Sequence, residues 1–318
     1  MRASRSGSLV VAALLTAAPP ALGAQDTRRM DPSAAELAIA TGRLDVAEAA
    51  LYDAATRRPR DPAARGALGA FLAARGKFLV GATLLDEALQ FGADTAPIQA
   101  RQAEIYRWTG EYGRIPALRT VRIPPPMREA FRRAAGTTSG GAAADTVELL
   151  PNEALGLGRI VIDVRGVRVS ADVEPSGNGL MLPSSMELLR AIDAVGAQGD
   201  TTFGVTAIGI GGVRLGPVPV RLVPGLTVAK IGLDVLSLLT PTFDRDARTL
   251  TVHGAPYEAG GTPRGTPLPV LLTFPGVTFV ARDGTAPVGL DTPAGHAALR
   301  GTRWTLDVPR GVVVVEAR

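Results

Sequence analysis

The 318-residue sequence contains no cysteine, only two histidines (His253 and His296) and only 4% aromatic residues. The absence of cysteine excludes disulfides, thiolate metal sites and cysteine nucleophiles. Two histidines argue against a histidine-rich metal site and against a histidine-based catalytic triad. The sequence also has no GxSxG, P-loop or HExxH motif. We therefore expect neither a metal nor a cofactor.

The charge pattern argues against nucleic acid as a partner. The chain carries 34 basic and 30 acidic residues, a net charge of +4. Its arginines are scattered, and few aromatic residues lie among them. A nucleic-acid-binding surface needs a basic stripe or aromatic residues that stack on bases. A solvated, arginine-rich surface is the simpler interpretation.

No apolar run is long enough to span a membrane, but the N-terminus has the pattern of a secretory signal. Arg2 and Arg5 form its charged region, Leu9–Ala18 its apolar region and Ala21–Ala24 a small-residue cleavage site. We predict a signal peptide at 1–24 and an exported protein, periplasmic or extracellular, with no integral membrane span after signal removal. An uncleaved anchor is the alternative.

Residues 33–118 contain an internal repeat. Gly42, Gly76 and Gly110 are each 34 residues apart, and amphipathic segments flank them. This period resembles that of tetratricopeptide repeats, although Arg65 stands where that motif has a large aromatic residue. Such repeats present a concave face to peptides or proteins. Alternatively, so short an array only packs against the neighbouring domain.

Residues 119–154 change in composition. Pro124–Pro126 imposes an extended conformation, and the GTTSGGAAAD stretch that follows is of low complexity. We predict a flexible linker and a domain boundary in this segment.

Residues 155–256 have the alternation and turns of a mostly-β domain. The stretch Val167–Pro183 predicts a strand, a turn of small residues and a second strand. The further expected elements, in order, are a helix at Ser184–Val195, strands at Thr202–Ile210, Val213–Leu215 and Val218–Val223, an apolar Gly-Leu-Asp segment at Lys230–Leu239, and a hairpin at Thr242–Val252.

This order resembles that of the retropepsin-like aspartic peptidases, in which a strand leads into an Asp-Thr-Gly turn and a Gly-x-Asp-x-Leu segment follows later. The resemblance implies a mostly-β, retropepsin-like barrel. With the helical repeat region before it, the expected fold is an α+β multidomain protein. The resemblance also implies an acid pair that shares one proton and activates water. A chain with a single such turn must form a homodimer to assemble that pair.

The turn departs from the family pattern, because Glu174, Pro175 and Ser176 stand where the resemblance places Asp, Thr and Gly. The longer glutamate displaces its carboxylate from the dyad geometry. Proline lacks both the hydroxyl and the N–H that would brace the turn. We therefore predict a catalytically degenerate turn, with Ser176 and Gly177 as candidate binding residues. Asp172 is a fallback acid whose simpler role is an exposed strand carboxylate.

The other candidate residues lie later in the chain. Gly211 and Gly212 form a turn between two strands and are further candidate binding residues. Asp234 is predicted to cap a helix start after Gly232. Asp163 and Asp244 are predicted to be structural.

The C-terminal β segment, residues 267–318, contains Leu290-Asp291-Thr292-Pro293, an echo of the family turn. Its end parallels the earlier hairpin, with Thr305 in the place of Thr242 and Asp307 in that of Asp244. One hypothesis is a shortened second lobe that sets Asp291 opposite Glu174 as a catalytic pair. The alternative is a loop aspartate in an added β-layer.

The sequence thus predicts an exported, catalytically degenerate protein of the aspartic peptidase type that binds a peptide or protein. The first alternative is an active aspartic endopeptidase with an atypical carboxylate pair. The second is a purely structural envelope protein.

Overall fold

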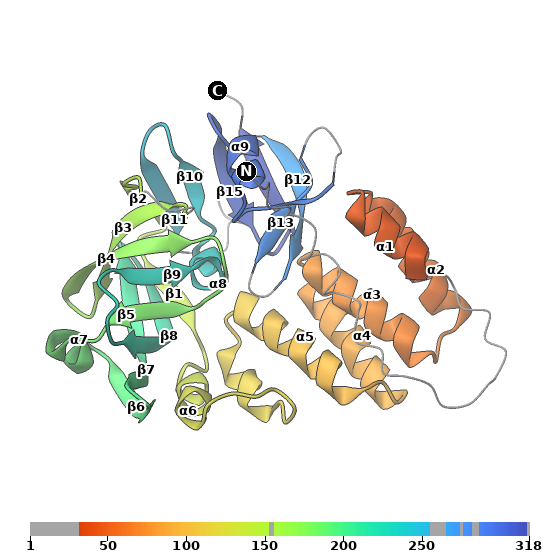
Figure 1. Cartoon of the computed structure of the whole chain (residues 1–318), viewed down its shortest axis with the longest axis horizontal. Coiled ribbons are helices and arrows are strands. Elements are labelled where there is room, and N and C mark those ends of the chain that lie inside the picture. Colours follow the sequence, from red (N-terminus) through yellow and green to blue (C-terminus); the bar gives the residue numbers. More distant parts are fainter. Residues whose placement is uncertain (1–31, 153–155, 255–264, 274–275, 282–285, 317–318) are drawn as a thin grey trace, which may run out of the picture.

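The computed structural model describes residues 32–152, 156–254, 265–273, 276–281 and 286–316. A helical region, a barrel-like first sheet and a second sheet follow one another along the chain (Figure 1). This confirms the expected order of a helical region before a β-barrel that carries extra strands. The predicted signal segment lies outside the described residues.

The helical region consists of five α-helices joined by short turns. They are α1 (Pro32–Ala40), α2 (Leu44–Arg57), α3 (Pro62–Ala74), α4 (Phe78–Gln90) and α5 (Thr95–Trp108). Gly42, Gly76 and Gly110 follow α1, α3 and α5 with φ of 73°, 76° and 72°. This left-handed conformation favours glycine and ends a helix. The 34-residue spacing is therefore a spacing of helix ends, and the tetratricopeptide assignment stays a prediction.

The segment predicted as a flexible linker is structured instead. It contains the helix α6 (Pro125–Arg133) and the strands β1 (Thr138–Gly141) and β2 (Ala144–Glu148), and the 3-10 helix η2 (Tyr112–Ala117) comes just before it. Strand β1 pairs with the first sheet and β2 with the second. The small side chains of this segment do not favour a strand, but neighbouring strands supply backbone partners for it.

The first sheet closes on itself. Its elements are β3 (Gly158–Val164), β4 (Val167–Glu174), β5 (Leu180–Pro183), α7 (Met186–Ala191), β6 (Asp193–Gln198), β7 (Thr201–Ile210), β8 (Val213–Val223) and β9 (Ala229–Gly232). The order is β1-β8-β5-β9-β4-β3-β7-β6, and the additional β7–β8 pairing closes the barrel. Strand β9 lies between β4 and β5, parallel to the first and antiparallel to the second.

The second sheet combines the closing hairpin with the C-terminal segment. The helix α8 (Leu233–Leu236) and the 3-10 helix η3 (Ser237–Leu239) lead into it. Its later elements are β10 (Thr242–Asp244), β11 (Thr249–His253), β12 (Thr266–Leu272), β13 (Val277–Phe279), β14 (Val288–Gly289), α9 (Pro293–Ala298), β15 (Arg303–Asp307) and β16 (Val312–Glu316). The strand order is β14-β13-β12-β16-β15-β10-β11-β2.

The two hairpins of this sheet, β10–β11 and β15–β16, have the same turn. The backbone N–H of Ala247 donates to Asp244 Oδ1 at 2.8 Å, and that of Arg310 donates to Asp307 Oδ1 at 3.1 Å. The predicted recurrence of the hairpin is therefore confirmed in detail.

These hairpins meet around a local two-fold axis. Strands β10 and β15 are antiparallel, and Thr242 lies directly opposite its counterpart Thr305. Their buried hydroxyl oxygens are 2.8 Å apart. The rings of Phe243 and Trp304 stack beside them, with centroids 4.2 Å apart. Antiparallel pairing of equivalent strands is also how two-fold symmetric dimers join.

The helical region docks on the second sheet through two glycines. A Cβ on Gly76 would collide with the backbone of Val308 and Gly311, and one on Gly311 would collide with the Arg75 carbonyl. Arg75 Nη1 also donates to the Val270 carbonyl at 3.0 Å. Helix turn and hairpin turn therefore touch backbone to backbone.

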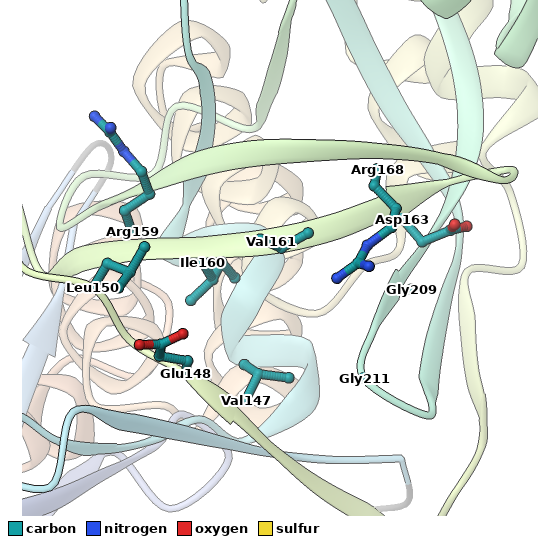
Figure 2. Close-up of a pocket in the computed structure, with 10 residues that line it drawn as sticks. All are labelled: Val147, Glu148, Leu150, Arg159, Ile160, Val161, Asp163, Arg168, Gly209 and Gly211. Carbon is teal, nitrogen blue, oxygen red and sulfur yellow. The ribbon is translucent and has the colours of Figure 1, made fainter.

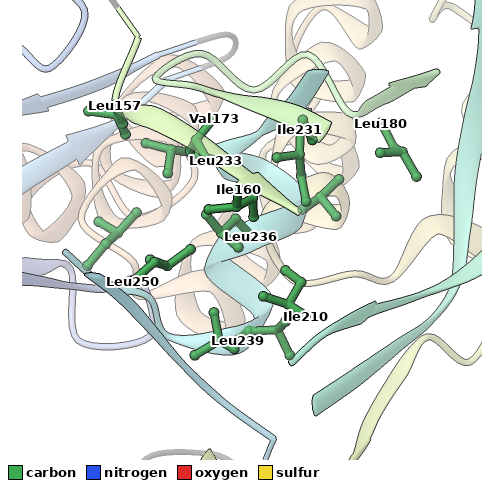
Figure 3. Packing of buried hydrophobic residues seen from close by; sticks show 14 of the residues in the cluster. Leu157, Ile160, Val173, Leu180, Ile210, Ile231, Leu233, Leu236, Leu239 and Leu250 are labelled. Carbon is green, nitrogen blue, oxygen red and sulfur yellow. The ribbon is translucent and has the colours of Figure 1, made fainter. Parts of the chain in front are cut away.

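A single apolar core connects the two sheets. Figure 3 shows Ile160, Val173 and Ile231 of the barrel strands packing near Leu233 and Leu236 of α8. All five of these side chains are buried. Leu250, in β11 of the second sheet, belongs to the same cluster.

Candidate functional site

The turn after β4 is held in place by the start of α8. The Ser176 carbonyl accepts from the backbone N–H of Asn178 at 3.0 Å and from that of Leu233 at 3.2 Å. The N–H of Gly232 donates to the Gly179 carbonyl at 2.8 Å. A Cβ on Gly232 would lie 2.6 Å from Asn178 N and 2.8 Å from Ser176 O. Only glycine therefore allows this close approach.

Asp234 lies beneath the turn and is fully buried. Its Oδ1 accepts from the N–H of Gly179 at 3.0 Å, so it fixes the turn. The predicted role as a helix cap is wrong, because α8 begins at Leu233 after Gly232 and has no side-chain cap bond. Burial raises the pKa of Asp234, and the positive charge of Arg107 opposes that rise. Sequence reasoning did not predict the bond from Gly179 to Asp234, which joins residues far apart in the chain. The Gly-Leu-Asp segment was the one sequence feature that could have indicated it.

Glu174 is paired with a cation. Its Oε1 lies 2.9 Å from Lys230 Nζ of the neighbouring strand β9. Asp172, the fallback acid, forms a bidentate ion pair with Arg159 at 2.8 and 3.3 Å. The carboxylates of Asp172 and Glu174 are therefore both engaged by basic groups.

Ser176 and Gly177 belong to the turn itself. The hydroxyl of Ser176 accepts from Asn178 Nδ2 at 2.6 Å, and Gly177 is buried. Gly211 and Gly212 lie elsewhere, in the turn between β7 and β8. The N–H of Gly212 donates to Asp145 Oδ2 at 2.7 Å. The two predicted binding pairs thus occupy different places, and a binding role for either stays a prediction.

Asp291 lies in the second sheet, between β14 and α9, with an exposed side chain. Within the described residues, no hydrogen bond or ion pair joins it to Glu174. A Cβ on Gly289 would lie 2.6 Å from Asp291 Oδ1, just as one on Gly232 would lie 2.5 Å from Asp234 Oδ1. The counterpart of Asp291 in the barrel is therefore Asp234, not the residue of the family turn.

The strand order of the C-terminal segment differs from that of the barrel. Strand β12 pairs directly with β13, and β14 pairs with the outer edge of β13. In the barrel, by contrast, β9 lies between β4 and β5. Gly289-Leu290-Asp291 therefore repeats the local sequence of Gly232-Leu233-Asp234 without its surrounding strands.

A groove with a volume of about 420 Å³ lies between β2 and β3 (Figure 2). Strand β2 is the last strand of its sheet, so its outer edge pairs with no strand in the described part of the chain. Strand β3 pairs with β4 on one side, but with β7 only at Asp163 and Val164. Two open strand edges therefore face the groove.

Both ends of the groove are closed by hydrogen bonds. Leu150 and Arg159 exchange backbone bonds of 2.8 and 2.7 Å at one end. The bond from Gly212 to Asp145 closes the other. Residues 146–149 lie between the two closed ends, and the first three of them belong to β2, so the groove has the length of a short peptide.

The groove is lined by apolar and charged side chains. Val161 and Leu150 are 38% and 39% exposed, which is high for large apolar residues. Glu148, Asp163 and Arg168 are exposed around them (Figure 2). With Arg159 already paired to Asp172, these three charges sum to −1.

Comparisons with known proteins identify a distant structural match. The sequence matches no protein-family profile and no curated protein. The structure matches a retropepsin-like aspartic protease from Rickettsia conorii with a TM-score of 0.27 and 14% identity, over 37% of this chain and 92% of that chain.

No cluster of three or more histidine, cysteine, aspartate or glutamate side chains that could hold a metal ion occurs within the described ranges. In the same ranges, no helix has the length and apolar character needed to cross a membrane.

Proposed function

We propose that this chain is an exported, retropepsin-like protein that has no peptidase activity and binds extended peptide segments of other proteins. The observation that carries the proposal is the groove between β2 and β3, which presents two open strand edges. The order of elements from β3 to β11, with β9 between β4 and β5, supports the retropepsin-like assignment.

The groups around the turn support the proposed absence of activity. An aspartic dyad needs two carboxylates that share one proton about 3 Å apart. The Glu174 carboxylate instead contacts the Lys230 ammonium at 2.9 Å. Pro175 and Ser176 further remove the hydroxyl and the small residue of the family turn.

The groove suits binding by strand addition. Open strand edges offer backbone N–H and C=O groups to an extended peptide, and alternate side chains then enter pockets. Val147 and Val161 offer apolar contacts to one set of side chains. The net negative charge from Glu148, Asp163 and Arg168 favours basic residues in the other set.

The test is fluorescence anisotropy with a labelled pentapeptide that alternates lysine and valine. We expect binding to the wild type and at least about ten-fold weaker binding to Val161→Lys, which places in the groove a charge that repels the lysines of the probe. Val46→Lys is the matched control, because Val46 is 45% exposed on α2, outside the groove. A peptide with N-methylated backbone amides loses the main-chain bonds. Equal binding of that peptide contradicts strand addition.

The alternative, an active endopeptidase, is tested separately. We expect no cleavage of an unfolded protein substrate from acidic to neutral pH, with or without a pepsin-type inhibitor. Cleavage at acidic pH that disappears in both Glu174→Gln and Asp291→Asn would instead establish an atypical carboxylate pair.

A further inference from the structure

A second cavity lies where the helical region meets the barrel. Its volume is about 210 Å³. Residues of α5, η2 and α6 line one side, and residues around β5, β8 and α8 line the other. This cavity is separate from the groove between β2 and β3, and the two share no lining residue.

Two buried polar atoms in the cavity wall lack hydrogen-bond partners among the described residues. They are Asp234 Oδ2 and the hydroxyl of Tyr112. Asp234 is 0% exposed and Tyr112 is 2% exposed. Buried polar atoms in proteins are normally hydrogen-bonded. Two such atoms on one cavity indicate a site that a polar molecule completes.

Two guanidinium groups line the same cavity. Arg221 Nη2 donates to the Asn178 carbonyl at 2.8 Å, which uses one of its five N–H donors. Arg107 lies over the Phe131 ring, 5.0 Å from its centroid. Burial lowers the pKa of both arginines, and the Asp234 charge opposes this. The two arginines and the Asp234 carboxylate give the cavity lining a net charge of +1, which favours binding of an anion.

We propose that this cavity binds a small carboxylate with an adjacent hydrogen-bond donor, either a free amino acid or the C-terminal residue of a peptide. The ligand carboxylate accepts from Arg107, Arg221 and the Tyr112 hydroxyl, because guanidinium groups bind carboxylates with paired N–H donors. The adjacent ligand N–H donates to Asp234 Oδ2.

The remaining lining sets the side chain that the site accepts. Met127, Leu180 and Val235 are apolar, so they favour a short apolar side chain. Arg107, Met127 and Arg221 are half-buried, so they lie at the entrance of the cavity from solvent. This site does not depend on the proposed peptide groove, and the two can be tested apart.

The experiment is isothermal titration calorimetry of the full chain with L-valine, N-acetyl-L-valine and N-acetyl-L-valine amide. We expect one of the two acids to bind and the amide to bind at least about ten-fold more weakly. Binding of L-valine assigns a free amino acid, and binding of N-acetyl-L-valine alone assigns a peptide C-terminus. No binding of either acid at millimolar concentration, or equal binding of the amide, overturns the proposal.

Variants assign the binding to this cavity. Tyr112→Phe removes only the hydroxyl and is expected to weaken binding about three-fold or more. Arg221→Met is expected to weaken it about ten-fold. Arg214→Met is the matched control, since Arg214 is exposed on the same strand outside the cavity. Val161→Lys should also leave this binding unchanged. Wild-type affinity in both cavity variants overturns the assignment.

Discussion

At the residue scale, Asp234 makes the stability of the folded state depend on pH. Its pKa is raised by burial, so the folded state holds this proton to a higher pH than the unfolded chain does. Protonation therefore favours folding, and the contribution of Asp234 to stability is lost as pH rises above the ordinary aspartate range.

Asp234→Asn tests this, because asparagine keeps an acceptor for the Gly179 N–H and does not titrate. We expect the melting temperature of the variant, relative to the wild type, to increase from about pH 4 to about pH 8. Differential scanning fluorimetry across that range measures it. A difference that stays constant with pH would contradict the buried-carboxylate account.

Gly232 is the second residue with a defined consequence. A Cβ there would lie 2.5 Å from Asp234 Oδ1 and within 2.8 Å of two backbone atoms of the turn. We expect Gly232→Ala to lower the free energy of unfolding by about 1–3 kcal/mol in urea denaturation. Gly140→Ala is the control, because its Cβ meets no atom within 4 Å. Similar losses in both variants would refute a steric cause.

Residue roles were only partly predictable. The sequence predicted that a strand leads into Glu174 and that the turn departs from Asp-Thr-Gly, because both are local features. The ion pair with Lys230 and the bond from Gly179 to Asp234 were not predictable. Each joins residues more than 50 positions apart, so each depends on β9 lying between β4 and β5.

At the scale of elements, β10 and β15 are joined by the Thr242–Thr305 hydroxyl pair. We expect Thr242→Val or Thr305→Val alone to be destabilising, because each leaves one buried hydroxyl without its partner. The double variant should lose less than the sum, with a coupling of about 1 kcal/mol. A double-mutant cycle from urea denaturation measures this. Strict additivity would show that the pair contributes no coupling.

Local pattern and tertiary pairing disagree at one element. The spacing of Met186, Leu189 and Ile192 predicts a helix over Ser184–Val195, but the helix covers only Met186–Ala191. Met186 and Leu189 are 65% and 38% exposed, so the predicted apolar face is not the buried one. Strand β6 starts at Asp193 because β7 offers it a backbone partner. Sequence periodicity contains no information about that partner.

At the scale of the whole molecule, the two-fold pairing of β10 with β15 bears on assembly. The edge of β10 that could join a second copy is covered by a strand of the same chain. We therefore expect a monomer instead of the homodimer that a single-turn peptidase requires. Light scattering after size exclusion should give a mass no greater than 32.9 kDa. A concentration-independent mass of twice that value would contradict this.

The contact between Gly76 and Gly311 also constrains the order in which the protein can be completed. Gly76 is synthesised long before Gly311, because ribosomes add only about 5–20 residues per second. The helices are therefore synthesised well before the surface on which they dock. Strand β2 is likewise synthesised before β11, the strand with which it pairs. During synthesis these early segments must stay soluble without their final partners. A holding chaperone that binds them would therefore act mainly in that interval.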